Sequence, residues 1–134
     1  MSRITLDSNA YTHLFKGDKK VEEEVSKAQS VYMSVIVIGE LLAAFKGGKY
    51  HSKNKEQFER FLDKVIISII DVGRETANIY GEVKYYLDKK GKPIPTNDLW
   101  IASHAIEAGS VLITYDKHFL KIPGLRIWDK LRDN

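Results

Sequence analysis

Residues 30–45 read SVYMSVIVIGELLAAF, and this stretch passes directly from a strand into a helix. We predict a strand over Ser30–Met33, a helix cap at Ser34 and a helix that reaches about Phe45 before Gly47 ends it. A strand followed by a helix is the building unit of an α/β fold. The segments on both sides of this unit show the same alternation.

Four further strands and five further helices are predicted around this unit. The strands are Ile4–Asp7, Ile66–Val72, Val111–Thr114 and Leu125–Trp128. The first of these helices is capped by Ser8 or Asn9 and ends near Phe15. The other four span Asp18–Ala28, Lys55–Val65, Glu75–Lys90, and Thr96 or Asn97 to Ala108. Because strands separated by helices pair in parallel through right-handed crossovers, we predict an α/β fold, a three-layer α/β/α sandwich. The 134 residues suit a single domain over 1–134.

The composition excludes several classes of protein. The chain has no cysteine, which excludes a disulfide scaffold, a thiol nucleophile and zinc sites built on cysteine. No apolar run approaches the ~20 residues that span a bilayer, so we expect no membrane partner. The first acidic residue from the amino terminus is Asp7, and no apolar stretch precedes it. We therefore expect no secretory signal and a cytoplasmic location.

The net charge of +3 does not by itself indicate a nucleic-acid-binding protein, but its distribution is uneven. Lys46–Lys55 holds four lysines and no acid, and Lys84–Lys92 holds four lysines and one acid, Asp88. Such patches attract phosphate chains electrostatically, although solvated lysine-rich loops have the same composition.

Four carboxylates occupy unusual places in this pattern. Asp7 ends the first strand and Asp116 follows the fourth; they meet if those strands are neighbours, although Asp also ends strands because it caps turns. Glu40 is the only ionisable residue of an apolar helix, so we predict a buried helix and a carboxylate with a partner, ordinarily a lysine or arginine. Asp98 lies in the first turn of its helix on the stripe that faces the core, where it can also act as a capping acid.

Taken together, these four acids predict a cation site. Two carboxylates ~4 Å apart repel by roughly 4 kcal/mol at an effective dielectric of 20, so converging acids need a positive charge between them. Oxygen ligands without cysteine or a histidine pair select hard cations such as Mg²⁺ or Mn²⁺. A divalent ion held in this way binds phosphate and lowers the pKa of a bound water. That is the chemistry of metal-assisted phosphodiester hydrolysis.

The same acids lie in four segments that resemble the motifs of the PIN-domain ribonucleases, specifically the VapC-type toxins of toxin–antitoxin pairs. The segments are ITLDSNAY with Asp7, SVIVIGELLAAF with Glu40, GKPIPTNDLWIASHA with Asp98, and VLITYDKHF with Asp116 and, at the hydroxyl position, Thr114. Their order and spacing fit, and the resemblance covers nearly the whole chain. It implies a five-stranded parallel sheet, dependence on Mg²⁺ or Mn²⁺, homodimers, and inhibition by a small antitoxin protein.

The resemblance also implies roles for individual residues of an endoribonuclease toxin. Asp7, Asp98 and Asp116 are expected to hold the metal, and Glu40 to coordinate it directly or through water, so that a metal-activated water attacks the RNA phosphodiester in line. Asn9 and Thr114 are expected to support the site by orienting the water or a metal ligand. Their ordinary roles are a helix cap and a β-branched strand residue.

Other interpretations remain open. An aspartyl phosphatase requires a second Asp where this chain has Asn9, and a phospho-receiver domain requires paired acids after the first strand together with an Asp after the third, which only Asp71 provides. A catalytically silent PIN fold that binds RNA is disfavoured by the complete set of four acids, and an RNA-cleavage assay decides it. The four histidines form no pair with metal-ligand spacing, and we expect His104 at the surface.

Overall fold

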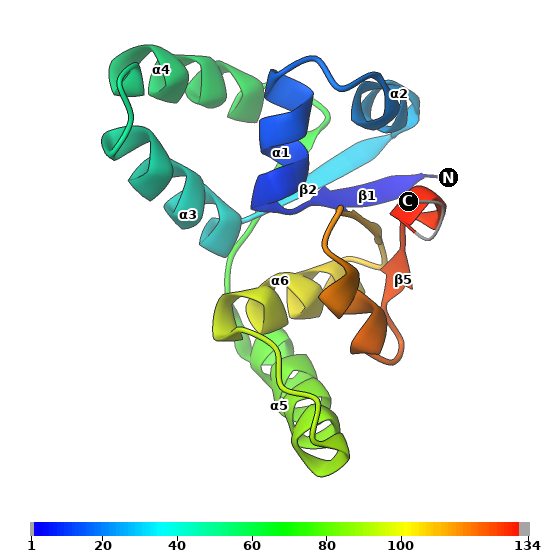
Figure 1. Cartoon of the computed structure of the whole chain (residues 1–134). Coiled ribbons are helices and arrows are strands. Elements are labelled where there is room, and N and C mark those ends of the chain that lie inside the picture. The colour runs from blue at the N-terminus through cyan, green and yellow to red at the C-terminus, as the bar shows by residue number, and fades with distance from the viewer. Residues whose placement is uncertain (1, 132–134) are drawn as a thin grey trace.

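The predicted strands form one parallel sheet in a computed structural model that describes residues 2–131 (Figure 1). They are β1 (Arg3–Leu6), β2 (Ser30–Ser34), β3 (Ile67–Ile70), β4 (Val111–Ile113) and β5 (Arg126–Ile127). Their order is β3-β2-β1-β4-β5, and every pairing is parallel. Thr5 of the central strand lies opposite Tyr32 of β2 and Leu112 of β4, which fixes the register. The prediction of a five-stranded parallel sheet is confirmed.

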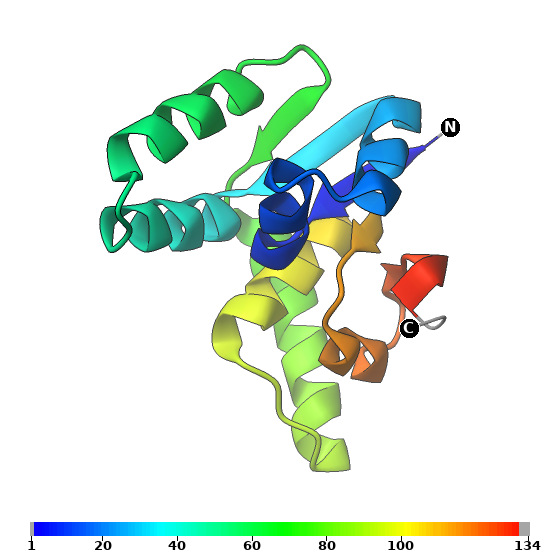
Figure 2. The same ribbon diagram turned by 45° about the horizontal axis from the view of Figure 1, so that its top comes forward.

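Helices cover both faces of this sheet, which confirms the predicted three-layer sandwich. They are α1 (Ser8–Phe15), α2 (Lys19–Lys27), α3 (Val35–Lys46), α4 (His51–Leu62), α5 (Arg74–Lys90) and α6 (Thr96–Glu107). Helices α1 and α2 lie on one side of β1 and β2, whereas α5 and α6 pack against each other on the opposite side (Figures 1 and 2). Two short 3₁₀ helices, η1 (Lys117–Lys121) and η2 (Asp129–Leu131), follow β4 and β5. Within residues 2–131, no helix has both the length and the apolar character to cross a membrane.

The core extends from the central strand into the helices. Ile4 and Leu6 of β1 are buried, and α6 contributes the continuous buried run Ile101–Ala105. On the other face, Phe58 of α4 packs edge-on against Tyr11 of α1, with ring centroids 4.9 Å apart, and against Phe45 of α3 at 5.7 Å. Phe58 therefore fastens the α3–α4 hairpin to the helix that follows β1.

Several predicted boundaries are wrong by a few residues. Helix α4 spans His51–Leu62 rather than Lys55–Val65, and Val65, the predicted last residue of this helix, is 100% exposed. This helix begins without a side-chain cap, so the sequence has no polar residue that marks its start. Strands β3 and β5 are also shorter than the predicted 66–72 and 125–128.

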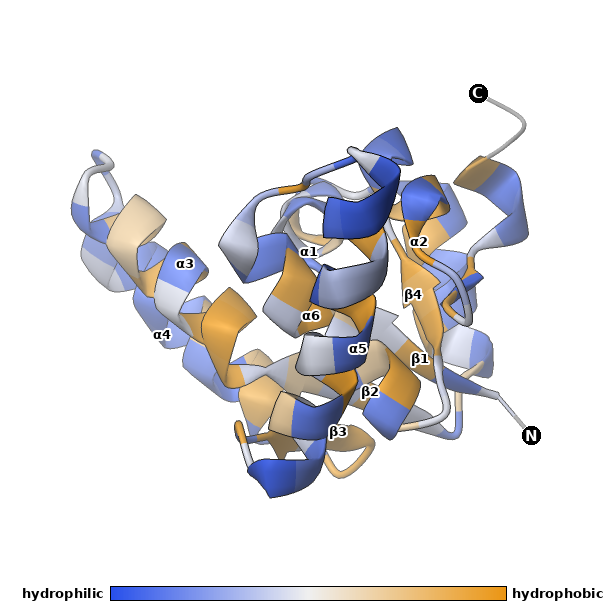
Figure 3. Cartoon of the chain, turned by 90° about the horizontal axis from the view of Figure 1, so that it is seen from below, coloured by the Kyte–Doolittle hydropathy of each residue, from blue (hydrophilic) through white to orange (hydrophobic). Residues whose placement is uncertain are grey.

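Helix α3 differs from its prediction in burial. Its apolar sequence predicts a helix buried all round, but only Val37 and Leu41 are buried, while Ala43 and Ala44 are exposed. Figure 3 shows α3 and α4 extending together from one side of the molecule, with apolar residues along α3. The helix contacts β2, α1, α4 and α6, but its outer apolar strip, which includes Ala43 and Ala44, remains accessible to a partner.

We expect Phe58→Ala to destabilise the protein strongly, because the buried ring is lost and a cavity remains. Large-to-small substitutions of a buried Phe cost about 3–5 kcal/mol in the free energy of unfolding. Val65→Ala, at a fully exposed position beyond the end of α4, should cost little. Denaturant unfolding of the two variants checks this, and an equal loss in both would contradict the proposed anchoring role of Phe58.

Candidate functional site

The candidate site lies where the order of the strands reverses. The chain runs outward from β1 to β2 and β3, then crosses back through α5 and α6 to place β4 on the other side of β1. In open α/β sheets, ligands bind at the carboxyl ends of the strands at such a reversal point. Asp7 directly follows β1, and Asp116 lies in the loop directly after β4. Strands β1 and β4 are neighbours, which is the condition under which the sequence predicts that Asp7 and Asp116 meet.

Asp7 is the buried centre of this site, with 4% of its surface exposed. One carboxylate oxygen accepts the backbone N–H of Ala10 at 2.8 Å and thereby caps α1, a role the sequence assigned to Ser8 or Asn9. The other oxygen accepts the hydroxyl of Thr114, directly after β4. Burial raises the pKa of Asp7 to about 6; the two hydrogen bonds oppose this shift, and the charges of Asp98 and Asp116 add to it.

Glu40 connects three helices at the edge of this centre. Its Oε1 accepts the hydroxyl of Ser8 in α1 at 2.6 Å, and its Oε2 accepts the side-chain amide of Asn97 in α6 at 3.2 Å. The carboxylate is half-buried rather than buried, because α3 itself is only partly covered. Both of these hydrogen-bond partners, Ser8 and Asn97, are neutral side chains.

Asp98 and Asp116 lie on either side of one imidazole ring. Oδ2 of Asp98, in the first turn of α6, lies 2.8 Å from Nε2 of His118. Oδ1 of Asp116, the cap of η1, lies 2.9 Å from Nδ1 of the same ring. Burial raises the pKa of Asp98, and the charges of Glu40 and Asp116 raise it further, whereas His118 opposes the shift.

His118 is the residue of this site that sequence reasoning missed. The sequence analysis considered histidines as metal ligands only in pairs with metal-ligand spacing. The structure instead combines one histidine with an acid from α6 and an acid from the loop after β4. The only local signal is the spacing Asp116-x-His118, in which both residues belong to one 3₁₀ turn.

His104 lies elsewhere in the fold, and its predicted surface position is wrong. The residue is fully buried, with Nδ1 2.7 Å from Ser34 Oγ and Nε2 3.1 Å from the carbonyl of Asp71. Burial lowers the pKa of His104, so it stays a neutral hydrogen-bonding link between β2, α6 and the loop after β3.

The two supporting residues have different surroundings. Asn9 lies in the first turn of α1 with an exposed side chain. Thr114 is buried, and its hydroxyl donates to Asp7 while accepting the backbone N–H of Asp116 at 3.0 Å. Thr114 therefore holds two of the acids in fixed positions.

These residues fit a divalent cation. Single ligand atoms of Asp98, Asp116 and His118 all lie within 4.8 Å of one another. The pKa values of Asp7 and Asp98 are raised partly by the charges of the other acids, which is the mutual repulsion that a cation relieves. The donors are carboxylate oxygens and one imidazole, a set that suits Mg²⁺ or Mn²⁺.

Comparison with known proteins agrees with this geometry. Residues 4–125 match the family model described as PIN domain. The chain belongs to the PIN domain family. Ribonuclease VapC2 of Rickettsia felis is 36% identical to this PIN domain over 111 residues, 81% of each protein. Ribonuclease VapC1 of Haemophilus influenzae (strain R2866) is 34% identical over 131 residues, 92% of this chain and 95% of that protein. These relatives place this PIN domain among the VapC ribonucleases.

A solved structure has the same fold. VapBC2 from Rickettsia felis, bound to a DNA fragment from its promoter, superposes on this PIN domain with a TM-score of 0.82. The sequence identity is 29%, and the match covers 94% of this chain and 97% of that chain. The match with this solved structure thus extends along nearly the whole PIN domain.

We expect the metal-free protein to become more stable as the pH falls from 7.5 through 6. The folded-state pKa of Asp7, about 6, exceeds its ordinary value of 3.8, so between these values the folded state binds more protons than the unfolded state. The ionised carboxylate therefore destabilises the fold by up to about 3 kcal/mol at pH 7.5, a penalty that protonation removes.

Asp7→Asn should remove this contribution, because its amide keeps the size of the side chain without the charge. Denaturant unfolding in excess EDTA at pH 7.5 and 5.5 measures the gain for wild type, Asp7→Asn and, as a control, the exposed Asp63→Asn. An undiminished gain in Asp7→Asn would show that another group causes it.

Proposed function

We propose that this protein is a metal-dependent endoribonuclease that acts as the toxin of a toxin–antitoxin pair. The observation that carries the proposal is the convergence of Asp7, Glu40, Asp98 and Asp116 at the reversal point of the sheet. Two relatives more than 30% identical over most of the chain are ribonucleases by name, which supports RNA as the substrate class.

In this proposal the four acids have different roles, which follow from their surroundings. Asp7, Asp98 and Asp116 hold Mg²⁺ or Mn²⁺, and Glu40 coordinates directly or through a water that its own free lone pairs orient. The bound cation supplies a Lewis acid for the phosphodiester and for the attacking water. Thr114 orients Asp7, and Ser8 and Asn97 orient Glu40, so the carboxylates are positioned before substrate arrives. We expect products with a 5′-phosphate and a 3′-hydroxyl.

The lysine-rich stretches give the RNA backbone two places to bind. One stretch, Lys46–Lys55, joins α3 to α4, and the other, Lys84–Lys92, forms the last turns of α5 and the loop toward α6. In the second stretch the exposed Tyr85 lies beneath the ammonium of Lys89, 5.7 Å from its ring centroid. Such a cation beside an aromatic face suits a phosphate chain with stacked bases. Trp100, by contrast, is stacked on Tyr80 at 4.0 Å, so one face of its ring is already occupied.

The phospho-receiver interpretation conflicts with the strand order. It requires an Asp after the third strand beside the acids of the first strand. Asp71 follows β3, and β2 lies between β3 and β1, so Asp71 ends at the far edge of the sheet. Its backbone carbonyl instead contacts the buried His104.

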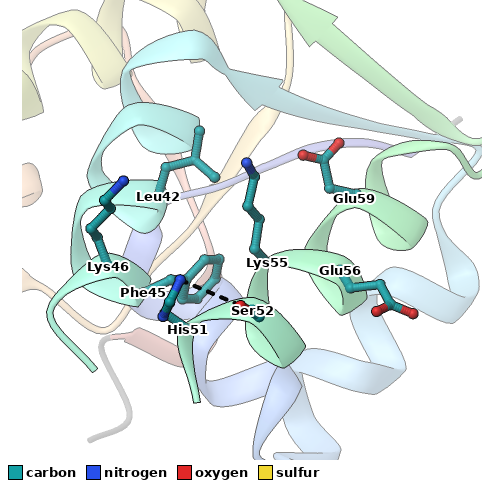
Figure 4. Close-up of a pocket in the computed structure, with 8 residues that line it drawn as sticks. All are labelled: Leu42, Phe45, Lys46, His51, Ser52, Lys55, Glu56 and Glu59. Carbon is teal, nitrogen blue, oxygen red and sulfur yellow. Dashed lines mark hydrogen bonds between the residues drawn. The ribbon is translucent and has the colours of Figure 1, made fainter. Parts of the chain in front are cut away.

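We further propose that the groove between α3 and α4 binds the antitoxin. Its cavity has a volume of about 540 Å³. Figure 4 shows Leu42 and Phe45 on the α3 side of this cavity and Lys55, Glu56 and Glu59 on α4. Its apolar floor and charged rim suit a peptide segment of a partner protein. The related VapBC structures are complexes, which supports an antitoxin as the occupant. We also propose that the protein forms a homodimer and acts in the cytoplasm.

We expect RNA cleavage to require a divalent cation and all four acids. EDTA should stop cleavage without unfolding the protein, and Mg²⁺ or Mn²⁺ should restore it. Asp7→Asn and Glu40→Gln should each lower the cleavage rate at least about a hundredfold, because each removes a charge from the cation site. The matched control is Glu22→Gln, an exposed acid on α2. Cleavage that persists in excess EDTA would refute the proposed metal-dependent activity. Folded wild-type protein that cleaves no RNA with any added divalent metal ion would refute it as well.

We expect Leu42→Glu to weaken the complex with the antitoxin, because it puts a charge on the apolar floor of the groove. The partner to test is the antitoxin, which we expect to be a small protein encoded next to this chain. Binding measured by calorimetry should fall at least about tenfold, with RNA cleavage by the free toxin retained. Val65→Glu, at a fully exposed position outside the groove, is the control. Unchanged affinity in Leu42→Glu would move the antitoxin to another surface.

A further inference from the structure

The imidazole of His118 has a position that the proposed roles of the four acids do not explain. Its two nitrogens lie 2.8 Å from Asp98 Oδ2 and 2.9 Å from Asp116 Oδ1. Nε2 is buried from solvent, yet it makes no hydrogen bond of proper geometry within residues 2–131. Buried polar atoms are nearly always hydrogen-bonded, so a buried nitrogen that lies close to a carboxylate without forming a hydrogen bond requires an explanation.

The separation of Nε2 from Asp98 Oδ2 is the separation of two adjacent metal ligands. Around an octahedral ion, donors at roughly 2.1 Å that subtend a right angle lie roughly 3 Å apart. The observed 2.8 Å agrees with that value, and both residues belong to the group whose ligand atoms lie within 4.8 Å of one another. A cation that binds Asp98 therefore comes within reach of Nε2 with little movement of the ring.

The other side of the ring is held in the way that metal-bound histidines are held. Nδ1 faces Asp116 Oδ1, and the backbone N–H of His118 donates to that same oxygen at 3.2 Å. Asp116 is itself fixed, because its backbone N–H donates to Thr114 Oγ1. A carboxylate at one imidazole nitrogen sets the tautomer that presents the other nitrogen's lone pair to a metal.

We propose that His118 Nε2 is a direct ligand of the divalent cation, adjacent to Asp98, and that Asp116 orients the imidazole through Nδ1. This inference rests on the cation site of the proposed function and changes one role in it: Asp116 acts through the imidazole of His118, which takes its place as a direct ligand. One nitrogen among oxygen donors favours Mn²⁺ over Mg²⁺, because Mn²⁺ accepts imidazole more readily than Mg²⁺ does.

The competing explanation is that a protonated His118 takes the place of the cation between Asp98 and Asp116. The two explanations predict opposite effects of removing the ring. If His118 is a ligand, its loss weakens Mn²⁺ binding; if it occupies the position of the cation, its loss strengthens binding because the competitor is gone.

The decisive experiment is pulsed electron paramagnetic resonance of the full chain loaded with Mn²⁺. We expect a nitrogen modulation in the wild type that changes from the ¹⁴N to the ¹⁵N pattern when only histidine is labelled with ¹⁵N. The modulation should vanish in His118→Gln and persist in His51→Gln, a control on the exposed part of α4. Calorimetry should show Mn²⁺ affinity falling on the order of tenfold or more in His118→Gln, with a smaller change for Mg²⁺.

Three results would overturn the inference: no histidine modulation in the wild type, a modulation that survives in His118→Gln, or tighter Mn²⁺ binding by that variant. A protein that binds no Mn²⁺ overturns it as well. RNA cleavage measured on the same samples separates this inference from the proposed function. Cleavage without a histidine signal refutes the ligand role alone, whereas a histidine signal without cleavage refutes the nuclease and leaves the metal ligand.

Discussion

The hydrogen bonds of Asp7 are the constraint on which the rest of the site depends. A carboxylate at the end of the central strand accepts the N–H of Ala10 with one oxygen and the hydroxyl of Thr114 with the other. It therefore joins the start of α1 to the end of β4 across the reversal point of the sheet. Burial makes its ionised form unfavourable, and these two hydrogen bonds offset only part of that cost. The fold accepts a destabilising charge at this point because the function proposed for the site needs it.

Glu40 extends this arrangement to the α3–α4 hairpin. Because its oxygens accept hydrogen bonds from Ser8 and Asn97, the first half of α3 is tied to α1 and α6. Two residues later, Leu42 faces the groove between α3 and α4. One helix thus carries both an acid of the candidate site and the floor of the candidate partner groove. The partial exposure of an almost wholly apolar helix is understandable in these terms, since its outer strip is suited to being covered by another chain.

The sequence predicts the fold, and it singles out four acids that the structure brings close together, because each of these features is local or pairwise. Strands between helices imply a parallel sheet, and acids at strand ends or in an apolar helix are conspicuous without any structure. Burial is harder to predict, because it depends on packing that the composition of a single helix does not reveal. Apolar α3 is partly exposed, and polar His104 is buried, since its two ring nitrogens find partners in Ser34 and the Asp71 carbonyl. His118 is missed for the same reason: only tertiary structure brings the first turn of α6 to its ring.

The partners of the four acids also explain how the site folds before any cation arrives. Asp7 has Thr114 and the N–H of Ala10, Glu40 has Ser8 and Asn97, and the last two acids share His118. Zinc-finger domains differ, since their ligands have no structure without metal and binding supplies the free energy of folding. Here the hydrogen bonds to Asp7 and Glu40, together with the contact between Asp116 and His118, keep the carboxylates in place despite their repulsion. Cation binding therefore acts on carboxylates that are already positioned, and its free energy goes into relieving repulsion rather than into ordering the chain.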